Sequence, residues 1–139
     1  MRARALAIAL APLVAATAIA SAEPPAREAV EAILMRAGLE RAAMRACAAN
    51  ERDSEAETVL TRSWRLDLTE SWDVLRKAGY PEGDVRGYLD RFDLDKMTPQ
   101  FRAPEGLSAF CATLGDWRKR FALLLVVLPQ LELRKLLQK

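Results

Sequence analysis

Two cysteines, Cys47 and Cys111, are the residues of this 139-residue sequence whose type most often carries chemistry. A catalytic cysteine usually needs a histidine as its base, and a zinc site usually needs four Cys or His ligands. The sequence has no histidine, no further cysteine, and no C-x-x-C motif for thiol exchange or haem attachment. We therefore predict no catalytic cysteine, no metal site and no cofactor. We expect the two cysteines to form one structural disulfide.

Acidic residues around position 93 are spaced like the start of a calcium-binding loop. Asp93 and Asp95 would be its first and third residues, but Met97 stands at the fifth position, where an oxygen ligand is needed. Thr98 replaces the required glycine, and Pro104 replaces the glutamate at the twelfth position. These mismatches favour solvated carboxylates over a calcium site.

Common enzyme motifs are missing, including the P-loop, the glycine-rich dinucleotide loop and the G-x-S-x-G nucleophile turn. Paired carboxylates can catalyse proton transfer without histidine, and Asp67 with Glu70 or Asp73 would be such a pair. Pairs of this kind are also common on helix surfaces. A small enzyme that uses carboxylates is therefore the third of our hypotheses.

The first 22 residues have the three parts of a secretory signal peptide. Arg2 and Arg4 precede an apolar run over residues 5–20, and small residues at positions 20 and 22 suit cleavage after Ala22. The run is short for a membrane-spanning helix. Cleavage would leave 19 basic and 19 acidic residues, because Arg2 and Arg4 are lost from the 21 basic ones. We expect a periplasmic or secreted protein without the basic stripe that nucleic acids require.

The mature part, residues 23–139, has helical spacing of its apolar residues throughout, and no stretch alternates as a strand would. Ser54 and Glu57 have the form of a capping box, and Gly79 suits the end of the helix that follows. Pro104 opens the longest expected helix, which Pro129 should kink or end. We predict one all-α domain over residues 23–139, a small bundle of four to five helices stapled by one disulfide.

Eight residues are candidates for a surface that binds a partner or a ligand. Trp64 and Trp72 lie eight residues apart on one face of a predicted helix, where core packing is the commoner role. The others occupy the C-terminal third of the chain: Trp117, Arg118, Arg120, Leu123, Val126 and Val127.

The stretch 121–131 is the most apolar part of the mature chain, and it is too short to cross a membrane. Three interpretations stay open for it. It is the central helix of the bundle, a surface that binds a partner, or a segment that contacts a membrane surface.

The function that we expect is that of an exported, non-enzymatic helical protein of the cell envelope. It would act through protein–protein interaction, as a subunit, inhibitor or chaperone-like factor, with another envelope protein or with a second copy of itself. The alternative is a carrier that holds a small apolar ligand between its helices.

Overall fold

The computed structural model describes residues 26–124 and 126–138, so the expected signal peptide lies outside the described residues. The described part is all-α, as predicted, and contains no strand. It has seven helices instead of four to five: α1 Arg27–Asn50, α2 Ser54–Lys77, α3 Glu82–Arg91, α4 Leu94–Met97, α5 Pro104–Leu114, α6 Trp117–Leu124 and α7 Pro129–Leu137.

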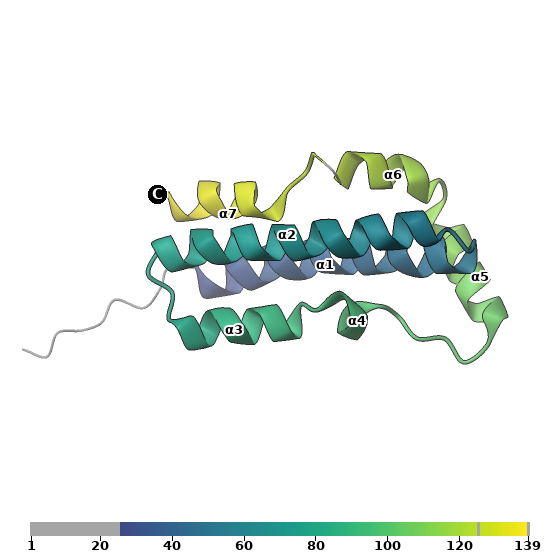
Figure 1. Ribbon diagram of the computed structural model, residues 1–139, viewed down its shortest axis with the longest axis horizontal. Coiled ribbons are helices and arrows are strands. Elements are labelled where there is room, and N and C mark those ends of the chain that lie inside the picture. The colour runs from purple at the N-terminus through teal and green to yellow at the C-terminus, as the bar shows by residue number, and fades with distance from the viewer. Residues whose placement is uncertain (1–25, 125, 139) are drawn as a thin grey trace, which may run out of the picture.

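Helices α1 and α2 form a long antiparallel hairpin that runs through the molecule (Figure 1). The other helices surround it, with α6 and α7 along one side, α3 and α4 along the opposite side, and α5 across the end. The first residue of α2 is Ser54, and the Asp53 side chain caps the helix by accepting a hydrogen bond from the Ala56 backbone N–H at 3.0 Å. The capping box predicted at Ser54 was therefore wrong by one residue.

The C-terminal third differs most from the prediction, because the long helix expected over residues 104–128 is two helices. Gly115 separates them with φ 65° and ψ −135°, a backbone conformation that favours glycine. After the break, the Asp116 carboxylate accepts a hydrogen bond from the Lys119 backbone N–H at 3.3 Å, in the first turn of α6. Pro129 begins α7, where its missing N–H has no cost.

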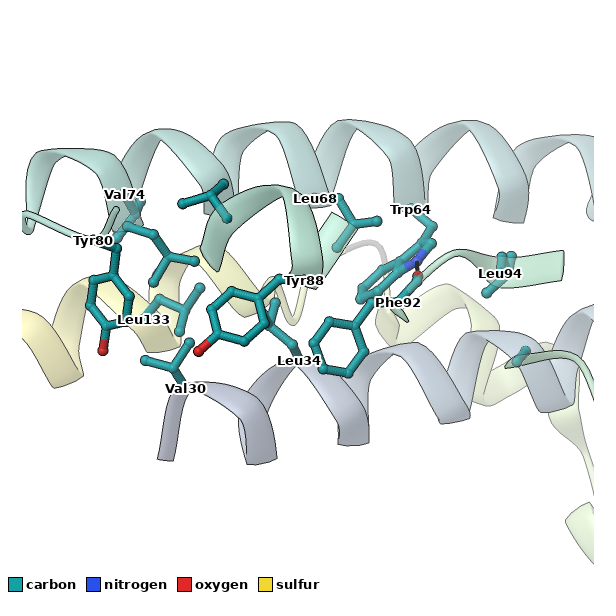
Figure 2. Packing of buried hydrophobic residues seen from close by; sticks show 13 residues of the cluster. Val30, Leu34, Trp64, Leu68, Val74, Tyr80, Tyr88, Phe92, Leu94 and Leu133 are labelled. Atoms are coloured by element: carbon teal, nitrogen blue, oxygen red, sulfur yellow. Dashed lines mark hydrogen bonds between the residues drawn. The ribbon is translucent and has the colours of Figure 1, made fainter. Parts of the chain in front are cut away.

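A first apolar cluster joins α1, α2, α3, α4 and α7 (Figure 2). Trp64 lies in this cluster with 1 % of its surface exposed, and its Nε1–H donates to the Phe92 carbonyl at 2.7 Å. Trp64 is therefore a core residue and contributes nothing to a binding surface, because neighbouring helices cover its ring.

A second apolar cluster joins the end of α1, the start of α2, and helices α5 and α6. Cys47 and Cys111 form a disulfide across it, with 5.5 Å between their Cα atoms, as the sequence predicted. Trp117 packs in the same cluster and is 3 % exposed, so it also belongs mainly to the core.

Candidate functional site

Three apolar side chains face solvent where α6 ends and the chain turns towards α7. Leu123, Val126 and Val127 are 62 %, 69 % and 53 % exposed, and we call them the C-terminal apolar surface. The backbone N–H groups of Val126 and Val127 both donate to the Leu123 carbonyl at 3.1 Å, which holds the three residues on one tight turn. Their exposure excludes the central-helix interpretation for these residues, whereas their neighbour Leu124 is buried in the second cluster.

A buried arginine lies beneath this turn. The Arg41 side chain is 2 % exposed and donates to the Asp67 carboxylate at 2.9 Å. The same guanidinium makes longer contacts with the carbonyls of Leu124 at 3.5 Å and Val127 at 3.4 Å. It therefore links the first two helices to the backbone that carries the C-terminal apolar surface.

Gln130 completes this polar network from the first turn of α7. Its amide donates to Asp67 at 3.2 Å and to Glu70 at 2.8 Å. Both carboxylate oxygens of Asp67 thus accept bonds from buried side chains, since Arg41 takes one and Gln130 the other. The guanidinium also lies over the Trp64 ring, 5.1 Å from its centroid.

Burial changes the ionisation of this pair. Removal from water raises the pKa of Asp67 above its ordinary value, although the attraction of Arg41 and the hydrogen bond from Gln130 oppose the shift. Burial likewise lowers the pKa of Arg41, against the attraction of Asp67. Asp67, which the sequence offered as a candidate for acid–base chemistry, is therefore surrounded by protein groups and largely removed from water.

The predicted basic residues of α6 form ion pairs with acidic residues of α1 and of the α1–α2 turn. Arg118 pairs with Glu51 and, at 2.9 Å, with Asp53, and its guanidinium lies over the Trp117 ring. Arg120 pairs with Glu40 at 3.0 Å. These contacts fix α6 against the hairpin.

Two carboxylates in the turn between α1 and α2, those of Glu51 and Asp53, have pKa values below their ordinary values. Hydrogen bonds from the Trp117 indole and from Arg118 lower the pKa of Glu51. The Ala56 backbone N–H and Arg118 lower the pKa of Asp53.

Trp72, the remaining candidate, is half-buried near the end of α2, with Arg76 lying 4.9 Å from its ring centroid. Trp117 packs near Glu51, at the opposite end of the hairpin. The structure therefore does not bring Trp64, Trp72 and Trp117 together in one exposed surface.

An apolar cleft that sequence patterns did not reveal lies between α1 and the α5–α6 pair. Its volume is about 270 Å³, and the Glu40–Arg120 ion pair stands at its edge. We call it the apolar cleft, and its apolar lining residues are Leu39, Ala43, Met44, Phe110, Leu114 and Trp117. After the break at Gly115, α6 runs back along α1 and contributes Trp117 and Arg120 to the wall of the cleft, and helical spacing does not signal this break.

Within residues 26–124 and 126–138, acidic and cysteine side chains form no group of three or more that could hold a metal ion. In the same residues, no helix combines the length and the apolar character that crossing a membrane requires. No family model, no curated protein and no solved structure matches the chain.

Proposed function

We propose that this is an exported, non-enzymatic protein of the cell envelope that binds another protein through the C-terminal apolar surface. Export is supported by the signal-like residues 1–22 and is compatible with the Cys47–Cys111 disulfide, because such bonds persist in oxidising compartments. The observation that carries the proposal is the exposure of three apolar side chains on one turn.

Backbone contacts of the described residues at that turn support a binding role. Scattered apolar residues are normal on protein surfaces, but apolar side chains that gather at one place favour contact with a partner. The backbone of this turn is held by Arg41 from below and by hydrogen bonds to the Leu123 carbonyl. Hydrogen bonds of this kind reduce the conformational entropy that the residues lose when a partner binds.

The test replaces the apolar surface while leaving the core intact. Leu123→Glu and Val127→Glu should abolish co-purification with the partner, or self-association measured by light scattering, without lowering the melting temperature. Met35→Glu is the matched control, because Met35 is exposed on α1 and outside the surface. Unchanged association in the first two variants would reject the surface, and so would equal loss in all three.

A carrier function is the second candidate, and the apolar cleft favours it. The cleft is slightly smaller than typical pockets for small molecules, which measure about 300–1,000 Å³, and Trp117 forms part of its wall. Titration with a medium-chain fatty acid should shift the tryptophan emission, and Ala43→Glu should remove the shift. Absence of both a shift and extractable apolar material would reject the carrier function.

A further inference from the structure

A second cleft, lined largely by polar and charged side chains, lies along the hairpin of α1 and α2. Its volume is about 470 Å³, and Leu66 is its one large apolar residue. We call it the arginine cleft, and it is lined by Arg45, Glu57, Thr58, Thr61, Arg62, Arg65 and Leu66. It shares no residue with the C-terminal apolar surface or with the apolar cleft.

Two guanidinium groups in the arginine cleft have no carboxylate partner among residues 26–124 and 126–138. Arg45 is already neutralised, since it pairs with Asp95 of α4 at 2.5 Å. Arg62 and Arg65 are exposed, and neither forms an ion pair with any residue that the structure describes. Glu57 is the single acidic residue of the lining, so the unpaired positive charges outnumber it.

This arrangement contrasts with the arginines that stabilise the fold. Arg27, Arg91, Arg118 and Arg120 each reach a carboxylate on another helix or on the α1–α2 turn. Arg62 and Arg65 lie three residues apart on α2, so they project from the same side of the helix about one turn apart. A guanidinium pair in this position can bind two carboxylates of an extended acidic segment.

The other polar groups of the cleft do not compete for this role. The Thr58 and Thr61 hydroxyls donate to the carbonyls of Ser54 and Glu57 in their own helix. Their hydrogens are therefore used, and recognition of negative charge falls to the arginines. Leu66 is 60 % exposed at the side of the cleft and offers one apolar contact.

We propose that the arginine cleft binds an acidic peptide segment of a protein partner, with Arg62 and Arg65 holding its carboxylates and Leu66 contacting an apolar side chain. Charge complementarity selects this occupant. Residues 23–139 carry equal numbers of acidic and basic residues, so the mature chain lacks the broad positive field that attracts nucleic acids. The proposal goes beyond the protein–protein function proposed above, because it assigns a separate site.

The test measures the fluorescence polarisation of a labelled hexaglutamate peptide with the exported protein at low salt. Arg62→Glu/Arg65→Glu should weaken binding by about tenfold or more, because both charge-assisted contacts become repulsive. Arg86→Glu/Arg102→Glu is the matched control, since both arginines are exposed outside the cleft and the net charge changes equally. The control should stay within about twofold of the wild type if binding is local.

Several outcomes would overturn the proposal. They are failure of the peptide to bind, equal weakening in both double variants, or equal binding of a hexaglutamine peptide. Inorganic phosphate or vesicles of phosphatidylglycerol that bind more tightly, with the same dependence on Arg62 and Arg65, would replace the acidic peptide as ligand. Leu123→Glu should bind the peptide like the wild type, so loss of the C-terminal apolar surface and loss of the cleft are distinguishable.

Discussion

Arg41 places a positive charge between two apolar clusters, where water cannot reach it. Its side chain and that of Asp67 are 2 % and 8 % exposed, so both charges lose most of their hydration. Attraction between buried charges rarely exceeds this desolvation by much, but removing one partner leaves the other uncompensated. The pair is therefore more important as a constraint on the packing of α1, α2 and the C-terminal segment than as a net source of stability.

Arg41→Met should lower the free energy of unfolding by about 3–5 kcal/mol, because the Asp67 carboxylate is left buried without its counterion. Arg41→Met/Asp67→Leu should recover most of that loss, since no buried charge remains. Urea denaturation at neutral pH measures both. Arg27→Met is the control, because its exposed pair with Asp84 should contribute only about 0–1 kcal/mol. Equal losses for Arg27→Met and Arg41→Met would contradict the argument.

The destabilisation by Arg41→Met should also depend on pH. The folded-state pKa of Asp67 is raised by burial, so the folded state binds its proton at a higher pH than the unfolded state does. Arg41 opposes this shift, so its loss should raise the pKa of Asp67 further in the variant, and the added cost of the buried carboxylate is lost as the pH falls through that higher pKa. The stability deficit of Arg41→Met should therefore shrink in mild acid, and a deficit independent of pH would contradict this assignment.

The residue types alone predicted the Cys47–Cys111 disulfide but not the buried Arg41–Asp67 ion pair. The disulfide followed from the sequence, because two cysteines allow a single intrachain pairing. Arg41 also left a signal, since it lies seven residues from both Leu34 and Ala48 on the inward face of α1. Its partner Asp67 and the amide of Gln130 lie on other helices, and only tertiary packing brings these three groups together.

At the scale of helices, the break at Gly115 decides where the C-terminal third of the chain lies. Its positive φ and its ψ of −135° place it in a region that side chains disfavour. Helical periodicity continues across this position, and a glycine within a helix costs only about 1 kcal/mol, so the sequence pattern predicted one helix. The aspartate that follows, whose carboxylate accepts from the Lys119 N–H, was the missed sign of a new start.

Gly115→Ala should lower the free energy of unfolding by about 1–3 kcal/mol, because alanine is strained in this conformation. Gly87→Ala is the matched control, since Gly87 lies inside α3 and an added Cβ would have no heavy atom within 4 Å. That substitution should stabilise the protein by up to about 1 kcal/mol through helix propensity. Chemical denaturation of the two variants should give changes in the free energy of unfolding of opposite sign. An unchanged free energy of unfolding for Gly115→Ala would show that this backbone conformation does not require glycine.

The α1–α2 turn should control stability in acid. The folded-state pKa values of Glu51 and Asp53 lie below their ordinary values, so these carboxylates stabilise the fold above their unfolded pKa values. That contribution is lost as the pH falls through the folded values. Glu51→Gln/Asp53→Asn should therefore be less stable than the wild type at neutral pH and should converge with it in strong acid. Denaturation at a series of pH values measures this, and parallel curves would contradict it.

At the scale of the whole molecule, the polar network lies where the two apolar clusters meet. Arg41 contacts Trp64 of the first cluster and the Leu124 backbone of the second, while Gln130 reaches the network from α7. The sequence shows that residues 121–131 are mostly apolar, but the spacing of apolar residues cannot decide which of them the folded protein buries and which it leaves exposed. The packing of Leu124 inward, which Arg41 helps to hold, is what turns Leu123 and Val127 towards solvent.

The disulfide should matter most for the second cluster. Helix α5 has no fully buried residue, and it meets α1 through Cys111 and the half-buried Phe110 and Leu114. The disulfide is therefore its strongest attachment. Cys47→Ala/Cys111→Ala should lower the free energy of unfolding by about 4 kcal/mol, as the chain-entropy model gives for the 64-residue separation.

Hydrogen exchange can show which helices lose stability when the disulfide is removed. In the double alanine variant, amide protection should fall first in α5 and α6, whereas α3 and the part of the hairpin that packs in the first cluster should keep theirs, because that cluster does not contain the disulfide. Reduction of the wild-type protein is the control and should give the same pattern without any change of sequence. A uniform loss of protection would mean that the two clusters unfold as one unit, with the Arg41–Asp67–Gln130 network coupling them more tightly than the covalent bond holds α5.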